Sequence, residues 1–400
     1  MSTLIVEVCK VQKVKKHPNA DRLDICQVKG WQTIVQKNQF EDGDLCVFIP
    51  PDSILPPELA NAPDDPICPG RLNVTKYLAA LPKDNDGNRP PGGRVKAARL
   101  RGESSYGLIM SIDPSKGDNP KWIVGTNVQK IFGITKWEPP VKTKEGDAAK
   151  NHPLFIKYID IEHLANYPDV IQEGEEVVIT EKIHGRNLRL GLIKEDEEKY
   201  VFMAGSHNVP RKEFTRHKIY SKNSFICWLQ AHHLWTVKRK ETKSVYWRLF
   251  DYKIKSVLNR LFDGESVQSV IVFAELFGHG MQDMQYGMSS SVGLRVFDIT
   301  VDGKYLDYDE KVNLCSKFDV PMVPELWRGP FSHDEVNKHV SGNTCVCEPS
   351  EAGPFKGREG VVVTPVKERI AKDMLATSTH GRVIFKAVSA DYLARANATD

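Results

Sequence analysis

The chain has 400 residues, of which 40% are hydrophobic and 27% charged, with a formal net charge of +3. This length predicts two or three domains, and the near balance of charge excludes a uniformly basic surface but not a local basic stripe. No apolar run approaches the roughly 18 residues of a membrane span, and Met1–Val8 has the pattern of a strand rather than of a signal peptide. The eight cysteines include no Cys-x-x-Cys pair, which argues against a disulfide scaffold or a zinc finger. We therefore expect an intracellular protein, cytoplasmic or nuclear, with reduced thiols and no membrane partner.

Short apolar runs separated by turn residues fill the first 135 residues. They predict strands at Leu4–Val8, Leu23–Val28, Thr33–Val35, Leu45–Ile49, Arg94–Leu100 and Tyr106–Ile112. A turn-rich stretch at 82–93 separates the last two from the others. Short strands at this density are typical of a small closed barrel, so residues 1–135 are predicted to form an OB-type domain.

Residues 136–153 are polar and aperiodic, which predicts an exposed linker. The pattern in 154–400 is mixed, with apolar helical spacing at 223–235 and 244–262. Strands are predicted at Glu176–Glu181, Leu188–Ile193, Tyr200–Ala204, Val270–Leu276, Leu294–Ile299, Gly360–Thr364 and Val383–Ala387. The sequence therefore predicts an α+β second domain of sheets and helices.

A lysine at a strand-to-turn junction is the first candidate for chemistry. Glu181 and Lys182 end an apolar strand, and Gly185 lies in the turn that follows. A lysine whose pKa is lowered by burial or by nearby cations can act as a covalent nucleophile. Glycine permits either a close approach of the backbone to a ligand or a positive φ. Lys-x-x-Gly alone is weak evidence, because an exposed lysine before a turn is its commonest meaning.

Charged residues inside later apolar strands strengthen this candidate. Glu275, Asp298 and Glu359 lie within or at the mouth of such strands, Phe297 precedes Asp298, and Lys386 ends a further strand. A buried carboxylate is costly unless it is paired or hydrogen-bonded. Each residue alone is compatible with a structural ion pair, but their order along the chain carries more information.

That order resembles the covalent nucleotidyltransferase superfamily of DNA ligases, RNA ligases and capping guanylyltransferases. Lys182–Gly185 matches motif I, Glu275 motif III, Phe297 and Asp298 motif IIIa, Glu359 motif IV and Lys386 motif V. The stretch Glu181–Asn187 is similar to the RNA ligase 2 branch, whereas DNA ligases and capping enzymes usually carry Asp where this chain has His184. The resemblance extends from Phe155 to Ala387.

The resemblance implies an ATP-grasp-like adenylation domain and an ATP-dependent RNA ligase that uses Mg²⁺ or Mn²⁺. Lys182 would form a lysyl-AMP intermediate, the AMP would pass to an RNA 5′-phosphate, and a 3′-hydroxyl would displace it. Lys386 would neutralise the α-phosphate and lower the pKa of Lys182, so these two are the implied catalytic residues. Glu359 and Glu275 would hold the metal. The implied nucleotide-binding residues are Glu181, Lys182, Ile183, Gly185, Asn187, Glu275, Phe297 (stacked on adenine), Glu359 and Lys386.

Two positions depart from the family pattern. Motif V of RNA ligases usually has two lysines separated by one residue, and the first position here is Ile384. Motif Ia commonly carries an arginine, where this chain has Ala204–His207. We expect Lys386 to bear the phosphate contact alone or with Arg382, and Arg211 or Arg216 to supply the missing cation.

The N-terminal module carries a resemblance of its own. His17–Leu23 is similar to the tRNA-binding OB domain of some synthetases, and such a module before an RNA ligase 2-like domain resembles the Deinococcus-type RNA ligase family. That family seals nicks with 3′-OH and 5′-phosphate ends, so the resemblance implies that the partner of this chain is RNA in a nicked duplex or an RNA–DNA hybrid. We expect the chain to be a monomer. Because alternate residues of a strand share a face, Arg94, Lys96 and Arg101 are predicted to line a basic surface that contacts phosphates.

Three alternatives remain open at this point. A GTP-dependent capping guanylyltransferase shares motif I but usually has its OB domain after the catalytic domain, and only 14 residues follow Lys386. A catalytically decayed RNA-binding protein is compatible with the altered motifs Ia and V, although the intact Lys182, Glu275 and Glu359 argue against it. A DNA ligase is disfavoured by the sequence around His184.

Overall fold

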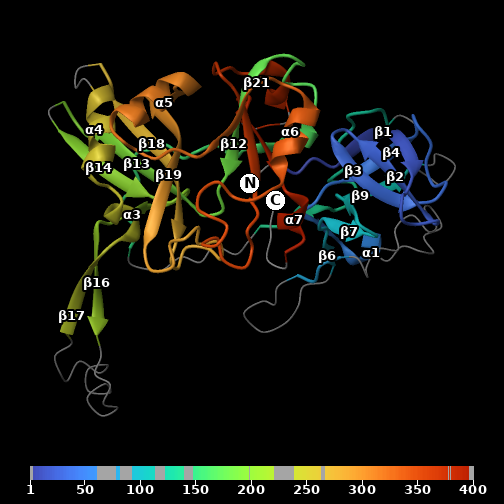
Figure 1. Cartoon of the computed structure of the whole chain (residues 1–400), viewed down its shortest axis with the longest axis horizontal. Coiled ribbons are helices and arrows are strands. Elements are labelled where there is room, and N and C mark those ends of the chain that lie inside the picture. The colour runs from blue at the N-terminus through green and yellow to red at the C-terminus, as the bar shows by residue number, and fades with distance from the viewer. Residues whose placement is uncertain are drawn as a thin grey trace, which may run out of the picture.

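The structure is a computed structural model that describes residues 3–60, 78–81, 92–112, 122–138, 147–197, 199–219, 238–262, 266–376, 378 and 380–395. The predicted helix at 223–235 and all but the last two residues of the turn-rich stretch at 82–93 lie outside these ranges. A β-barrel forms one end of the molecule, and two β-sheets with their helices form the rest (Figure 1).

The N-terminal barrel is built from short, mostly antiparallel strands. Its larger sheet has the order β3(Trp31–Gln36), β2(Leu23–Val28), β1(Glu7–Lys16), β4(Leu45–Ile49), β9(Leu108–Ser111). A smaller sheet has the order β10(Thr135–Lys136), β5(Ser53–Leu55), β6(Gly93–Arg94), and α1(Pro57–Ala60) and the hairpin β7(Ala98–Leu100)–β8(Glu103–Ser105) complete the module. The predicted strands at Leu23–Val28 and Leu45–Ile49 are confirmed. The predicted strand at Arg94–Leu100 is wrong, because residues 95–97 separate β6 from β7.

Two sheets form the second domain. The first has the order β11(Glu162–His163), β23(Phe385–Val388), β22(Gly360–Pro365), β12(Glu176–Lys182), β21(Glu325–Pro330). The second has the order β15(Pro210–Arg211), β14(Tyr200–Gly205), β13(Arg186–Lys194), β18(Ser269–Gly278), β19(Val292–Val301), β20(Lys304–Tyr305). Strand β12 of the first sheet leads directly into β13 of the second through residues 183–185. The Lys-x-x-Gly turn is therefore the connection between the two sheets.

Helices α3(Val245–Arg248) and α4(Tyr252–Leu261) cover the second sheet, and α4 buries Ile254, Val257 and Leu258 at helical spacing. The single helix predicted at 244–262 is thus two helices. The reason is local: the Asp251 side chain accepts a hydrogen bond from the Ile254 N–H and caps the start of α4. The remaining helices are α5(Tyr308–Lys317), α6(His333–Val340) and α7(Ala390–Leu393), with 3₁₀ turns η3(Leu164–Asn166) and η4(Lys372–Ala376).

A long hairpin, β16(Phe214–Ile219) with β17(Lys238–Lys243), projects from the second domain at the end far from the barrel (Figure 1). Among the described residues no helix has both the length and the apolar character that crossing a membrane requires. The six described cysteines are not disulfide-bonded; Cys68 and Cys227 lie outside the described ranges.

The barrel docks on the second domain through residues 162–166. Trp31 donates a 2.8 Å hydrogen bond from Nε1 to Asn166 Oδ1, and its ring stacks on His163 with centroids 4.1 Å apart. The Gly30 N–H donates to the Ala165 carbonyl at 3.0 Å. Because β11 pairs with β23, this docking segment is hydrogen-bonded to the strand that carries Lys386.

Candidate active site

A cavity of about 280 Å³ lies between the two sheets. The first sheet contributes Lys182 from β12, Glu359 from the residue before β22, and Lys386 from β23. The second sheet contributes Asn187 from β13, Glu275 from β18 and Phe297 from β19. The predicted nucleotide-binding residues that line the cavity are Glu181, Lys182, Ile183, Asn187, Glu275, Phe297, Glu359 and Lys386.

Lys182 and Glu359 form an ion pair in the wall of this cavity. The Lys182 side chain is 26% exposed and that of Glu359 only 7%. Burial alone would raise the pKa of Glu359, but Lys182 and His184 more than offset it and hold that pKa below its usual value. The second carboxylate oxygen, Oε2, lies 3.4 Å from His184 Nδ1 yet has no well-formed hydrogen bond among the described residues. The wall thus presents a buried carboxylate with acceptor capacity to spare.

Gly185 lies against Glu275 rather than in the cavity wall. Its backbone N–H partly offsets the rise in the pKa of the Glu275 carboxyl. A Cβ at position 185 would lie 2.4 Å from the Leu276 carbonyl oxygen and 2.9 Å from Glu275 Cγ, and its φ is not positive. Of the two reasons for a glycine here, close backbone approach is therefore the operative one.

Burial raises the pKa of Glu275 to about 8, against the opposing influence of Lys182 and with a further increase from Glu359. Without a bound cation, Glu275 therefore carries a proton over much of the neutral range. A nearby cation would favour its ionised form.

The residues present fit a hydrated divalent cation held together with a nucleotide. Glu275 and Glu359 supply carboxylates, and Asn187 Oδ1 is a second buried acceptor without a hydrogen bond in the described structure. Within the described ranges no three His, Cys, Asp or Glu side chains form a ready-made metal cluster. Mg²⁺ in nucleotide sites commonly takes one or two carboxylates and completes its shell with water and phosphate oxygens, so a preformed cage is not required.

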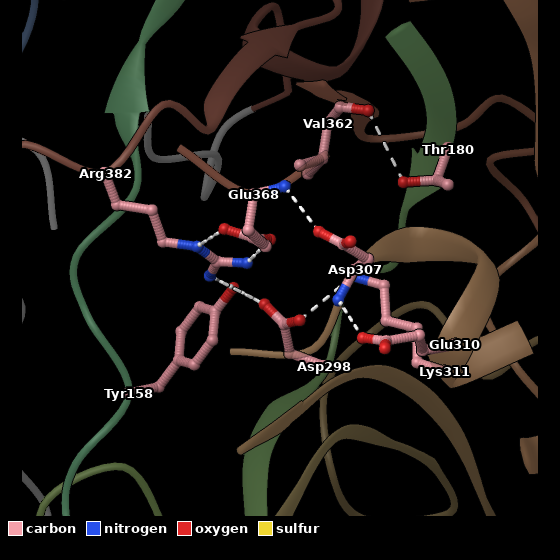
Figure 2. A network of polar contacts seen from close by, with 9 residues as sticks. All are labelled: Tyr158, Thr180, Asp298, Asp307, Glu310, Lys311, Val362, Glu368 and Arg382. Atoms are coloured by element: carbon pink, nitrogen blue, oxygen red, sulfur yellow. Dashed lines mark hydrogen bonds and ion pairs between the residues drawn. The ribbon is translucent and has the colours of Figure 1, made fainter. Parts of the chain in front are cut away.

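A network of polar contacts surrounds Asp298 (Figure 2), and two of its members, Tyr158 and Lys311, line the cavity. Asp298, fully buried, accepts hydrogen bonds from Tyr158 Oη at 2.7 Å, Lys311 Nζ at 2.9 Å and Arg382 Nη1 at 2.7 Å. Burial would raise the pKa of Asp298, but Arg382 and then Lys311 outweigh it, so the carboxylate is held ionised. Asp298 therefore joins β19 to α5 and to the segment before β23, while Phe297 beside it faces the cavity.

Two predicted sources of extra positive charge are not in the cavity wall. Arg382 is used by Asp298 and Glu368, and Arg211 is paired with Asp147. Arg216 lies on β16 of the projecting hairpin. Arg382 and Arg211 are not among the lining residues, so the structure does not support them in these roles. The side chain of Arg216 lies outside the described part of the structure, so its role stays a prediction. Lys311 from α5 and His207 line the cavity, but Lys311 is paired with Asp298 and burial lowers the pKa of His207. Ile384 lines it as well, at the place where the family pattern has a lysine.

Sequence reasoning also missed Arg189, which is fully buried. Its guanidinium donates to the carbonyls of Phe155, Ile156 and Ser206, each at 2.8 Å. It thereby holds together the segments that bring Tyr158 and His207 to the cavity. The detectable signal was an arginine between two leucines of an apolar strand, Leu188 and Leu190.

The predicted basic surface of Arg94, Lys96 and Arg101 is wrong for Arg94. Arg94 is buried, pairs with Asp52 and lies 3.6 Å over the Trp137 ring. Strand β1 instead carries four exposed lysines, Lys10, Lys13, Lys15 and Lys16.

Comparison with known proteins gives consistent matches. A family model described as RNA ligase matches residues 175–388, and a model of an OB-fold domain matches residues 5–62. The Naegleria gruberi RNA ligase solved with PPi has a TM-score of 0.66 and 22% identity, with 97% of this chain and 97% of that chain covered. A variant of that enzyme solved with ATP and Mn has a TM-score of 0.66 and 22% identity, with 97% of this chain and 98% of that chain covered. A further variant, solved with AMP and Mn, has a TM-score of 0.66 and 21% identity, with 97% of this chain and 98% of that chain covered. No curated protein sequence matches the chain. The predicted fold, an OB domain followed by an α+β nucleotidyltransferase domain, is confirmed.

Proposed function

The chain belongs to the RNA ligase family, and we propose that it joins RNA ends through a lysyl-AMP intermediate formed on Lys182 from ATP. The observation that carries this proposal is the ion pair of Lys182 with Glu359 in a cavity whose walls also hold Lys386 and Glu275. The ATP and Mn bound to the Naegleria gruberi enzyme support the choice of ATP with Mg²⁺ or Mn²⁺.

In the first step, Lys182 Nζ attacks the α-phosphorus of ATP. A P–N bond forms, the bond from the α-phosphorus to its bridging oxygen breaks, and pyrophosphate leaves. Glu359 stabilises the ammonium form of Lys182, so the lysine must lose its proton to solvent and turn away from Glu359 before it attacks. Lys386 stabilises the charge on the α-phosphate oxygens, and positioning with electrostatics supplies most of the rate. A divalent cation held by Glu359 and Glu275 would neutralise the polyphosphate.

In the later steps the AMP passes to an RNA 5′-phosphate, and an RNA 3′-hydroxyl displaces it to form the phosphodiester. The substrate we propose is a nick in duplex RNA or in an RNA–DNA hybrid, bound partly by the barrel and sealed by a monomer. The described cysteines, which form no disulfide with one another, support an intracellular location. Phe297, in the cavity wall next to Tyr158, is the proposed stacking surface for the adenine.

The test is incubation with α-labelled ATP and Mg²⁺ or Mn²⁺, beside α-labelled GTP, followed by denaturing electrophoresis. We expect acid-labile label from ATP that is abolished in Lys182→Ala, because this variant lacks the amine proposed to form the P–N bond. Lys194→Ala, at the far end of β13, is the matched control and should label normally.

Three results would contradict the proposal in different ways. Label that persists in Lys182→Ala would reject this nucleophile. Label from GTP alone would favour a capping-type guanylyltransferase. No label from either nucleotide would favour a decayed RNA-binding protein.

A further inference from the structure

The hairpin β16–β17 is strongly basic and contributes nothing to the described cavity wall. Its two strands hold six residues each, and together they contain six Lys and Arg but a single acidic residue, Glu241. Their net charge of +5 exceeds the +3 of the entire chain, so the rest of the chain is slightly acidic. The ribbon is therefore a concentrated patch of positive charge, and at its base Lys243 is paired with Glu213 at 3.1 Å.

The strand register shows how charge is arranged along the ribbon. Lys218 lies opposite Arg239, whereas Arg216 lies opposite Glu241, so one pair of like charges and one pair of opposite charges face each other. Like charges directly opposite each other destabilise an antiparallel pair, and a two-stranded hairpin has little stability of its own. A polyanion bound along the ribbon would offset its excess positive charge.

The base of the ribbon adds an aromatic surface to this charge. Phe214, the first residue of β16, is 48% exposed. It borders an open hollow whose lining includes Phe202 and Trp247, and Trp247 donates from Nε1 to the Arg211 carbonyl at 2.7 Å. Exposed aromatic rings beside lysines and arginines suit single-stranded nucleic acid, because bases stack on the rings while phosphates pair with the cations. An anionic lipid surface or an acidic protein would use only the charges.

We propose that the β16–β17 ribbon is a second RNA-binding surface, distinct from the barrel, at which Lys240 and Lys243 contact phosphates and Phe214 stacks with an unpaired base. This inference rests on the proposed function, since it takes RNA as the substrate. The ribbon and the barrel extend from opposite ends of the molecule, with the two sheets between them (Figure 1). RNA held at both ends would pass the cavity between the sheets.

The test measures binding of the full-length chain to fluorescent nicked duplex RNA with an unpaired end, by anisotropy over a salt series. For Lys240→Ala/Lys243→Ala we expect about tenfold weaker binding at low salt and a salt dependence reduced by about two phosphate contacts. Lys240→Arg/Lys243→Arg keeps the charges and should bind like the wild type. The control Lys317→Ala/Lys338→Ala removes two exposed lysines from α5 and α6 and should change neither quantity.

A second variant, Phe214→Ser, keeps every charge. It should weaken binding of RNA with an unpaired end while leaving the salt dependence unchanged. Unaltered RNA affinity in both Lys240→Ala/Lys243→Ala and Phe214→Ser would overturn the proposal. The proposal would also be overturned if these variants kept their affinity for RNA but lost binding to vesicles of anionic lipid.

Self-labelling with α-labelled ATP separates this inference from the proposed function. The ribbon variants should label normally, because their altered residues lie outside the cavity wall. If the wild-type chain failed to label yet its RNA binding still depended on the ribbon, the proposed lysyl-AMP chemistry would be rejected, whereas the proposed RNA-binding surface on the ribbon would be supported.

Discussion

At the scale of single residues, the ion pair of Lys182 with Glu359 has two opposing effects on a lysine that is proposed to act as a nucleophile. The pair with Glu359 keeps Lys182 in the wall and in its charged form. In the proposed mechanism the phosphate charge of a nucleotide competes with Glu359 for Lys182, and Lys386 lines the same cavity. We infer that nucleotide binding itself releases Lys182 from its partner.

Glu275 makes a pH prediction at the same scale. Its pKa in the folded chain, about 8, lies above the usual 4.5, so the folded chain holds a proton there that the unfolded chain releases. The resulting stability is complete below about pH 4.5 and is lost as the pH rises through about 8. A tenfold difference in proton affinity between the folded and unfolded chains corresponds to about 1.4 kcal/mol, and solvent at the cavity mouth reduces the effect. We therefore expect a loss of at least about 1 kcal/mol, or about 2 °C in Tm.

The measurement is Tm across this pH range without nucleotide or metal, for the wild type and Glu275→Gln. The wild-type Tm should fall more steeply toward alkaline pH than that of Glu275→Gln. Parallel curves would show that Glu275 ionises normally in the folded chain.

At the scale of elements, helix α7 and a distant loop fix the turn after Lys182. The His184 N–H donates to the Tyr286 hydroxyl at 2.8 Å, its Nε2 lies 2.9 Å from Asp283 Oδ1, and its Nδ1 lies 3.0 Å from the Tyr392 hydroxyl of α7. Arg395, just after α7, is paired with Asp283 and closes the ring of contacts. The turn that positions the lysine is therefore shaped by tertiary contacts.

Tyr392→Phe tests this role of α7. It removes one hydrogen bond to His184 and keeps the packing of the ring. A net loss of about 1 kcal/mol in the positioning of the turn predicts roughly fivefold slower self-labelling with ATP, with little change in the ATP concentration at half-maximal rate. Tyr252→Phe, an exposed tyrosine of α4, is the control. Equal rates for both variants would mean that α7 does not position the turn.

Local patterns predicted the elements only where no distant contact intervened. The strands β2 and β4 follow from alternation and flanking turns, and eight cavity residues follow from motifs carried on strands. The strand predicted at 94–100 stops after Arg94, whose contacts with Asp52 and Trp137 are distant in sequence and so not visible in any local pattern. Arg211 and Arg382 were misassigned for the same reason, since Asp147 and Asp298 are far from them in sequence.

At the scale of the whole molecule, the barrel and the catalytic domain share a close backbone contact. A Cβ at Gly30 would lie only 2.7 Å from Ala165 Cα. Ile5, at the start of the barrel, packs in the same apolar cluster as Leu164 and Val177 of the second domain. The two domains are therefore expected to unfold together.

Gly30→Val would insert a wedge at this contact. The φ of Gly30 is not positive, so its backbone conformation accepts valine. The nearest atoms to a Cβ at this position all belong to Ala165, so the steric clash would be with the second domain. Calorimetry should show one transition for the wild type and two, or one at a clearly lower temperature, for Gly30→Val. Gln36→Val, at the exposed end of β3, is the control. An unchanged single transition in Gly30→Val would show that the domains are not coupled there.

The strand order of the first sheet has a consequence for biosynthesis. The β12 strand with Lys182 pairs with β21 and β22, and β11 pairs with β23, so the partners come from residues 325–388. A ribosome releases the barrel first and Lys182 next, but Glu359 and Lys386 only much later. N-terminal domains fold during synthesis, and pairing between distant strands is slow. A nascent chain would thus have a folded barrel well before the cavity between the two sheets is complete.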